Sequence, residues 1–237
     1  MPEWWPAGTF MSRLGESARE DLLSLGSPRS FEPGDTLIHQ GDRLRDEVYL
    51  LRSRTGSTAC VKVWAYLENG AEALLGIRVS GDVVGELAAL RGTPRVATVA
   101  ACSPVLATVI SAEAFRAYLT RWPEAWNAVL RMVADQLDWA NNRRLDTAGY
   151  GVPARLARAL GELAERYGQE RPQGRDTGVD LTQLELGRLI GAGEDAVGKA
   201  VQELKKAGLV RSGYRRLFVT DVDGLSDFWG KDCRPDR

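Results

Sequence analysis

The sequence predicts an α+β fold in which an antiparallel roll of short strands comes first, a long helix follows, and two short helices with a hairpin come last. Three observations predict it. Turn residues recur every few positions in the first half, β-branched and aromatic runs lie between them, and a helical apolar period replaces this alternation from Ala112 onward. Short strands separated by frequent turns are typical of a roll or barrel.

The first half is expected to hold about eight short strands after a short entry helix at residues 17–25. The turn signals are Pro33-Gly34-Asp35, Gly41-Asp42, Gly56, Asn69-Gly70, Gly81-Asp82 and Gly92. The strand-like runs between them are residues 36–39, 48–51, 58–66, 74–79, 96–100 and 105–110. Asn69-Gly70 predicts a tight hairpin, because both residues tolerate the left-handed backbone that such turns require.

A glycine-flanked acid and a single arginine stand close together in an otherwise apolar stretch. Gly85-Glu86-Leu87 is followed shortly by Arg95 and Val96. A guanidinium presents a fork of donors that matches phosphate oxygens, while a carboxylate accepts from a sugar hydroxyl and can hold the arginine in place. The stretch therefore predicts a buried site for a phosphate and a ribose. From these residues alone, an ion pair that only closes a turn is the alternative.

A long helix is predicted at residues 123–148. Trp126, Leu130, Val133, Leu137 and Ala140 fall four and three residues apart, so they form an apolar seam along one side of it. The spacing leaves two arrangements open, namely pairing with a second copy of the chain and packing on the chain's own roll.

Glycine and proline break this helix at residues 149–153, which marks a domain boundary. An amphipathic helix is predicted at residues 154–167, with Leu156, Leu160 and Leu163 facing inward. The segment 168–180 is rich in glycine, proline and charge, and it predicts a solvated loop.

Two short helices around a glycine turn come next. Thr182 is a typical N-cap for the first, Gly191-Ala192-Gly193 supplies the turn, and the second runs to Gly208. Segments 209–211 and 217–219 then predict a hairpin. Two such helices form a helix-turn-helix, whose second helix can enter a DNA major groove, and the hairpin corresponds to a wing.

Composition argues against several classes of protein and of binding site. The chain has 31 Lys+Arg against 32 Asp+Glu, a net charge of -1, so a nucleic-acid surface must be local. Cys60, Cys102 and Cys233 are far apart in sequence and His39 is the only histidine, which argues against zinc, iron–sulfur and haem sites. We find no nucleophile–base set, and expect no catalytic residue and no enzyme. We find no signal peptide and no membrane span, and expect a cytoplasmic protein with no membrane partner.

Taken in order, these parts resemble the Crp/Fnr family of bacterial transcription regulators. The resemblance implies a cyclic-nucleotide-binding jelly roll at residues 1–122, a dimerisation helix and hinge at 123–150, and a winged helix-turn-helix domain at 151–237. It implies that Glu86 meets the ribose 2′-hydroxyl of a cyclic nucleotide and Arg95 the cyclic phosphate. Cyclic AMP is the implied effector, with no covalent cofactor. A homodimer, double-stranded DNA and RNA polymerase are the implied partners.

The expected ligand-binding residues are Gly85, Glu86, Leu87, Arg95, Val96, Asn141 and Asn142. Ala140 and Asn141 match the positions with which the family's receptor protein touches adenine, and Asn142 is next to them. Asparagine offers a donor and an acceptor to a base edge, but on a helical seam it can equally fix the register. Val96 has no hydroxyl, so a guanine-specific contact from that position is not expected.

The expected DNA-binding residues are Thr182, Gln183, Glu194, Asp195, Lys199, Arg215 and Arg216. Glu194 stands where the family has an arginine, and Lys199 where it has a second one. An acid repels phosphate and accepts only from a base such as cytosine. Two functions therefore stay open: a DNA-binding regulator gated by cyclic AMP or a similar anion, and a ligand-binding or protein-interaction module whose winged helix has lost specific DNA reading.

Overall fold

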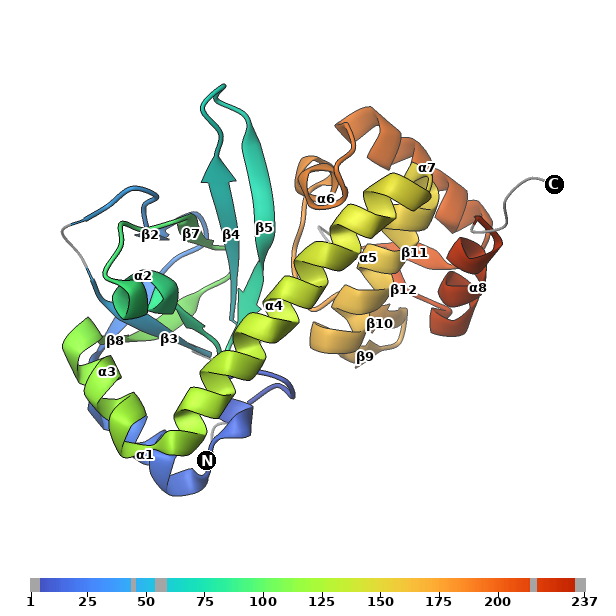
Figure 1. Cartoon of the computed structure of the whole chain (residues 1–237). Coiled ribbons are helices and arrows are strands. Elements are labelled where there is room, and N and C mark those ends of the chain that lie inside the picture. Colours follow the sequence, from blue (N-terminus) through green and yellow to red (C-terminus); the bar gives the residue numbers. More distant parts are fainter. Residues whose placement is uncertain (1–4, 44–45, 54–58, 214–216, 233–237) are drawn as a thin grey trace. The chain divides into compact units, whose positions relative to one another are not determined.

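The computed structural model describes residues 5–43, 46–53, 59–213 and 217–232 (Figure 1). The chain separates into two units, Met1–Leu137 and Asp138–Arg237. The boundary between them falls inside one continuous helix, α4, which spans Pro123–Gly149. The helix predicted at residues 123–148 is therefore confirmed to within one residue.

The first unit is a roll of two four-stranded antiparallel sheets, with strand orders β1-β8-β3-β6 and β2-β7-β4-β5. The strands are β1 (Ser27–Phe31), β2 (Thr36–Ile38), β3 (Val48–Ser53), β4 (Cys60–Tyr66), β5 (Glu72–Val79), β6 (Val83–Val84), β7 (Thr98–Ala101) and β8 (Val105–Ile110). All six predicted strands are present, and Asn69-Gly70 joins β4 to β5 in the expected hairpin. The sequence did not predict β1, which is mostly exposed and shows no apolar alternation, or β6, which has two residues.

Two hydrophobic clusters hold this unit together, and β3 contributes to both. Tyr49 and Leu51 pack into the interior of the roll, while Val48 and Leu50 pack under the helices on the other face. Successive strand residues point to opposite faces. Because both faces of β3 are buried, its sequence is continuously apolar rather than alternating.

Helices cover the outer cluster (Figure 1). They are a 3₁₀ turn at Met11–Arg13, α1 (Glu16–Ser24), α2 (Glu86–Arg91), α3 (Ala112–Arg121) and the first half of α4. The predicted entry helix at residues 17–25 corresponds to α1. The sequence did not predict α2 or α3 as separate helices. Ser111 begins α3 by accepting from the Ala114 amide, a cap that is readable from sequence.

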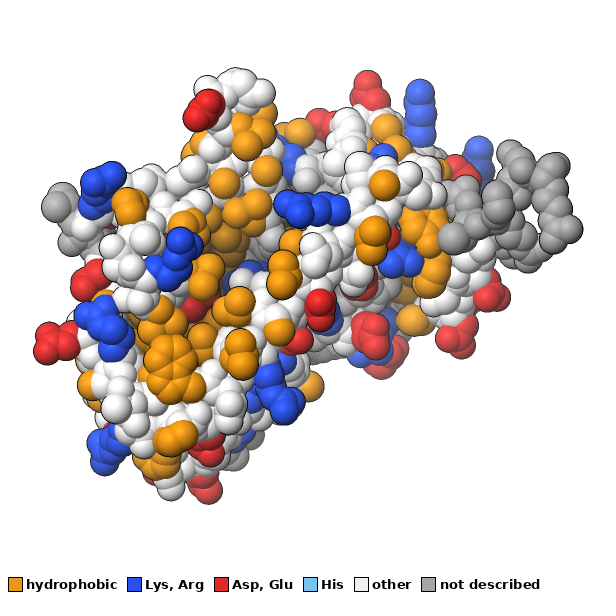
Figure 2. Space-filling view, viewed as in Figure 1, with side chains coloured by type: hydrophobic (Ala, Val, Ile, Leu, Met, Phe, Trp, Pro, Cys, Tyr) orange, Lys and Arg blue, Asp and Glu red, His pale blue; other side chains and the backbone are white. Residues whose placement is uncertain are grey.

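The apolar seam of α4 is exposed except at Val133, which is partly buried and packs against the outer cluster. Trp126, Leu130 and Leu137 are 47%, 67% and 59% exposed, whereas Val129 and Met132 on the neighbouring face are buried in the outer cluster. Hydrophobic side chains gather on this face of the molecule (Figure 2). The helix therefore packs on its own roll mainly through a neighbouring face, and the rest of the seam is left available within the described part of the chain.

The second unit holds α5 (Val152–Tyr167), α6 (Gln183–Ile190), α7 (Glu194–Lys206), α8 (Val222–Asp232) and a sheet of order β11-β12-β10-β9. Its strands are β9 (Glu170–Arg171), β10 (Gly174–Asp176), β11 (Val210–Ser212) and β12 (Leu217–Val219). The break before α5, both helices around the glycine turn and the β11–β12 hairpin were predicted and are confirmed.

The prediction of a solvated loop at residues 168–180 is wrong. This segment contains β9 and β10, and β10 pairs with β12 of the hairpin. Asp176 is 2% exposed because its carboxylate accepts from the amides of Gln169 and Gly178. Such a local hydrogen-bond network allows a charged, glycine-rich segment to be buried.

Residues 222–232 form α8, which packs against α5. Trp229 lies on the guanidinium of Arg158, with 4.4 Å from Cζ to the ring centroid, and Tyr150 lies at 5.2 Å from the same group. Arg158 also forms a 2.7 Å ion pair with buried Asp146 in the last turns of α4. These contacts fix the break between α4 and α5 within the second unit.

Candidate functional site

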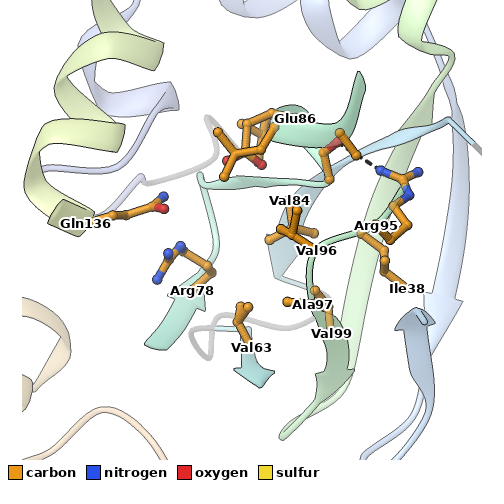
Figure 3. Close-up of a pocket in the computed structure, with 14 residues that line it drawn as sticks. Ile38, Val63, Arg78, Val84, Glu86, Arg95, Val96, Ala97, Val99 and Gln136 are labelled. Carbon is orange, nitrogen blue, oxygen red and sulfur yellow. Dashed lines mark hydrogen bonds between the residues drawn. The ribbon is translucent and has the colours of Figure 1, made fainter. Parts of the chain in front are cut away.

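A pocket lies in the first unit, beside the predicted phosphate-binding stretch (Figure 3). Its volume is about 450 Å³, including the part that is open to solvent. Its lining residues are Ile38, Val63, Arg78, Val83, Val84, Gly85, Glu86, Leu87, Ala88, Arg95, Val96, Ala97, Val99 and Gln136. The pocket is thus mostly apolar, with a few polar groups at its wall, as is common for small-ligand sites.

Gly85 allows this wall to form. Its backbone has a positive φ of 87°, and a Cβ at this position would stand 2.6 Å from Arg95 Nη1 and 2.9 Å from the Glu47 carbonyl oxygen. A larger residue would therefore be strained and would also displace the arginine.

Arg95 is held by carbonyl oxygens rather than by the acid. Its side chain donates to the Gly85 oxygen at 2.8 Å and to the Glu47 oxygen at 2.5 Å, and the residue is 4% exposed. The expectation that Glu86 holds the arginine is wrong, because no ion pair joins these two described residues. The two hydrogen bonds use two of the five guanidinium N–H donors, so donors are left for an anionic ligand.

Glu86 is the first residue of α2, and it is 5% exposed. Burial raises the pKa of its carboxyl to about 7, against the lowering effect of the Arg78 charge. Asp82, also buried, raises the pKa of Glu86 further, and Arg95 lowers it more weakly than Arg78 does. The acid is therefore close to half-ionised near neutral pH.

Two residues that were not predicted from the sequence, Arg78 and Gln136, line the same pocket. Arg78 on β5 faces Val61 of β4, whose side chain lies in the roll interior, so this arginine projects inward. Gln136 comes from α4, and its buried Nε2 has no hydrogen-bond partner among the described residues. In Figure 3 both lie on the side of the pocket away from Arg95. The signal for Arg78 was readable, since an arginine on the inward face of a strand is unusual.

Only some of the other expected ligand-binding residues line the pocket. Gly85, Leu87 and Val96 line the pocket together with Glu86 and Arg95, and Val96 has no hydroxyl to offer. Asn141 and Asn142 are exposed on α4 and are not among the lining residues. The position that α4 supplies to the pocket is Gln136.

The helix-turn-helix is built by local signals. The Thr182 hydroxyl accepts from the Glu185 amide, and the Glu185 carboxylate accepts from the Thr182 amide, which is a complete capping box for α6. Gly191 ends α6 in the left-handed conformation. A Cβ on Gly187 would stand 2.5 Å from the Ala192 oxygen, so only glycine permits the close approach of the turn to α6.

One face of α7 is exposed and polar. Asp195, Lys199, Gln202 and Lys206 recur at four, three and four residues and so lie on one side of the helix, next to exposed Glu194. A shallow groove on this face is lined by Gln183, Asp195, Gly198, Lys199, Gln202, Glu203 and Lys206. Gln183, Asp195 and Lys199 were predicted from the sequence, whereas Gln202 and Lys206 were not, although their helical spacing indicates the same face.

The predicted wing residues Arg215 and Arg216 lie outside the described residues. Among the residues that the structure does describe, no cluster of three or more His, Cys, Asp or Glu side chains could hold a metal ion. In the same residues, no helix is long and apolar enough to cross a membrane.

Two family models match the chain, a cyclic nucleotide-binding domain over residues 28–121 and a Crp-like helix-turn-helix domain over residues 154–228. The chain belongs to the Crp/Fnr family of transcription regulators. It is therefore a DNA-binding regulator with a cyclic-nucleotide-binding domain, and not an enzyme, as the sequence predicted.

Curated members of the family are similar over most of their length. A CRP-like cAMP-activated global transcriptional regulator of Mycobacterium tuberculosis is 29% identical over 220 residues, which is 93% of this chain and 95% of that protein. The cAMP-activated global transcriptional regulator CRP of Salmonella typhimurium is 27% identical over 186 residues, covering 78% of this chain and 85% of its own.

Solved structures show the same fold. The c-di-GMP-responsive global regulator CLP of Xanthomonas campestris matches with a TM-score of 0.70 and 20% identity, covering 87% of this chain and 100% of that one. A CRP-family transcriptional regulator of Thermus thermophilus matches with a TM-score of 0.69 and 24% identity, covering 87% of this chain and 98% of that one. The predicted α+β fold, with an antiparallel roll followed by a helix-turn-helix, is confirmed.

The raised pKa of Glu86 makes the stability of the parent protein depend on pH. Between pH 4.5, its ordinary pKa, and about 7 the folded state holds the proton more tightly than the unfolded state, so stability falls as pH rises through this window. Glu86→Gln removes that loss. The free energy of unfolding of the variant should exceed that of the parent by about 2–3 kcal/mol at pH 8 and by almost nothing near pH 4.5. Denaturant unfolding at the two pH values measures this difference.

The matched control for this prediction is Glu20→Gln, which neutralises an exposed carboxyl of α1. Its stability relative to the parent should stay nearly constant over the same pH range. A Glu86→Gln difference that is the same at both pH values would show that the buried acid does not bind a proton in the folded state.

Proposed function

We propose that this regulator is gated by cyclic AMP bound in the pocket of the roll. The observation that carries the proposal is that a buried arginine, oriented by two carbonyl oxygens, lines the same cavity as a buried acid. In this assignment Arg95 binds the cyclic phosphate and Glu86 accepts from the ribose 2′-hydroxyl. Gly85 gives the phosphate access to the backbone, and Leu87 and Val96 give apolar contact. Two relatives are named as cAMP-activated, which supports this effector, whereas another is named as responsive to c-di-GMP.

For the base of the nucleotide we propose contacts from α4. Asn141 and Asn142 stay the predicted residues, and Gln136 joins them because its side-chain amide lines the pocket with no hydrogen-bond partner in the described part of the chain. An amide can donate to or accept from a purine edge.

We propose that the regulator acts as a homodimer through the seam of α4. Exposed Trp126, Leu130 and Leu137 would form an apolar stripe in water on a monomer. In a homodimer the seams of the two chains would bury this stripe against one another. The dimer would then have two copies of α7, one for each half-site of the DNA. Double-stranded DNA is then the macromolecular partner, with RNA polymerase as a further partner, and the cytoplasm is the place of action.

Calorimetry followed by a gel shift tests the gating. The purified protein is titrated with cyclic AMP and, separately, with cyclic GMP, and is then mixed with the DNA upstream of its own gene with and without the bound nucleotide. We expect saturable binding of cyclic AMP and a shift that strengthens in its presence. Binding of neither nucleotide would remove the assignment of the pocket. A gel shift of the same strength with and without the nucleotide would contradict gating by the nucleotide but would still support DNA binding.

The acidic start of α7 predicts weak DNA binding. Glu194→Arg should raise the affinity for DNA broadly and favour guanine at one position per half-site, because a guanidinium donates bidentately to guanine. Lys199→Ala should weaken binding to all DNA sequences by the same factor, and it should lower the slope of log affinity against log salt concentration by about one. Fluorescence anisotropy over a salt series measures both effects.

Exposed Glu203 also lines the groove of α7. The variant Glu203→Gln shows whether removal of any negative charge from this helix changes DNA binding, or only a change at Glu194. If Glu203→Gln and Glu194→Arg change base preference in the same way, Glu194 has no special place. If no α7 variant alters DNA binding while effector affinity is intact, the helix acts as a protein-interaction surface instead.

A further inference from the structure

Two cysteines that are distant in sequence lie opposite one another in the roll. Strands β4 and β7 are antiparallel, with Val61 opposite Ala101 and Lys62 opposite Ala100. The next rung of this ladder places Cys60 opposite Cys102. Cys102 is the first residue after β7 and lies in a bend, where its amide donates to the Cys60 carbonyl oxygen at 2.9 Å. The Cys60 amide donates to Ser103 Oγ at 2.9 Å, so one ladder hydrogen bond still joins the two cysteines. Both cysteines are reduced in the structure.

The Cα spacing expected for this pair lies within the range that disulfides span. Side chains directly opposite on antiparallel strands point to the same face, with Cβ atoms about 4.5–5.5 Å apart. The Cα atoms of a hydrogen-bonded pair are about 5.5 Å apart, and disulfides usually span about 4.4–6.8 Å. Val61 and Ala101 point into the roll interior, so Cys60 and Cys102 share the other face. Because the Cβ atoms of a disulfide are about 3.5–4.5 Å apart, a bridge here needs a small approach of the two backbones as well as rotation of the side chains, but no new strand pairing.

The two thiols differ in access. Cys60 is 2% exposed, whereas Cys102 is partly exposed. Oxidants reach an accessible thiol first, and a buried neighbour can then resolve the product. Cys102 is therefore suited to react with a small oxidant, and Cys60 to complete the bridge.

We propose that Cys60 and Cys102 form a redox site that hydrogen peroxide converts to a cross-strand disulfide. The Cys102 thiolate attacks one peroxide oxygen, the O–O bond breaks, and the other oxygen leaves as water after taking up a proton. The resulting sulfenic acid is attacked by the Cys60 sulfur, the S–O bond breaks, and a second water leaves with the Cys60 proton. Two thiols are oxidised by two electrons in total, and one peroxide is reduced to two waters.

The bridge would join strands that also form a wall of the pocket. Val63 of β4 and Val99 of β7 are opposite one another three rungs along the same ladder, and both line the cavity. Oxidation would fix the spacing of these strands, so effector affinity should differ between the reduced and oxidised protein. This second consequence rests on the proposed function, whereas formation of the disulfide does not.

Mass spectrometry of the full-length protein tests the site. The reduced protein is treated with hydrogen peroxide while folded, remaining thiols are alkylated after denaturation, and the digest is analysed without reductant. We expect an intact mass lower by two hydrogens, a cross-linked peptide containing both Cys60 and Cys102, and alkylation of Cys233 alone. Dithiothreitol should restore all three thiols.

Variants separate the roles of the two thiols. Cys102→Ser should abolish the cross-link, and Cys233→Ser should leave it intact. Cys60→Ser should let dimedone trap a sulfenic acid on Cys102; if that variant does not fold, the comparison of Cys102→Ser with Cys233→Ser still decides. The proposal is overturned if the peroxide-treated, folded parent keeps all thiols, or if Cys233 takes part in the disulfide instead.

Discussion

Arg95→Leu should weaken binding of cyclic AMP by about 2–4 kcal/mol, roughly a 30- to 700-fold rise in Kd. The guanidinium is already buried and oriented by the oxygens of Gly85 and Glu47, so a bound phosphate gains a charge-assisted contact without having to order the side chain. Leucine offers no donor and leaves the phosphate without its cation. Isothermal titration of parent and variant at one pH and salt concentration measures the change.

Two further arginine variants make this result specific. Arg91→Leu is the same change at an exposed position of α2 outside the pocket, and it should leave Kd unaltered. Arg95→Lys keeps the charge but loses the bidentate fork, so its affinity should be intermediate. Circular dichroism must show that each variant is folded. A folded Arg95→Leu protein with the affinity of the parent would mean that another group, such as Arg78, holds the phosphate.

Leu137→Glu should convert the dimer into a monomer. A two-fold interface receives the change twice, and each copy would bury a carboxylate without a partner. The cost should be at least about 3 kcal/mol per dimer, a rise in the dimer dissociation constant of more than about 100-fold. DNA affinity should fall with it, because a monomer engages one half-site only. Analytical ultracentrifugation at micromolar concentration measures the first effect and fluorescence anisotropy the second.

Arg131→Glu is the control for the seam. Arg131 is exposed on α4, and its helical position lies away from the line of Trp126, Leu130 and Leu137. This variant adds more negative charge than Leu137→Glu, yet it should stay dimeric. A parent protein that sediments as a monomer at micromolar concentration would contradict the seam as a dimer interface, and so would a Leu137→Glu protein that remains a dimer.

Features that depend on a few neighbouring residues could be predicted from the sequence. Asn69-Gly70 specifies its hairpin, and Thr182 with Glu185 specifies the start of α6, because the backbone conformation and the capping hydrogen bonds are local. The stretch from Gly85 to Arg95 contains both candidate phosphate and ribose residues, and the structure places them in one pocket. The period of residues on α4 likewise indicated its seam.

Local signals failed where tertiary pairing supplies the partner. Residues 168–180 have the composition of a loop, but pairing of β10 with β12 satisfies their backbone, and burial of Asp176 completes the network. The partners of Arg95 were also mistaken. The sequence suggested Glu86, which is nearby in the chain, whereas one of the two oxygens that hold the guanidinium belongs to Glu47, 48 residues away.

The sequence by itself determined the fold class, the order of the parts and the two residues on which the effector proposal rests, because periodicity, turns and caps act over short distances. Only the tertiary structure decided which face of α4 stays open, that Arg78 and Gln136 reach the pocket, and that Cys60 faces Cys102. Each of these depends on strand register or on the packing of a helix against a sheet. Both are set by the burial of many distant side chains together, which no single segment of the chain encodes.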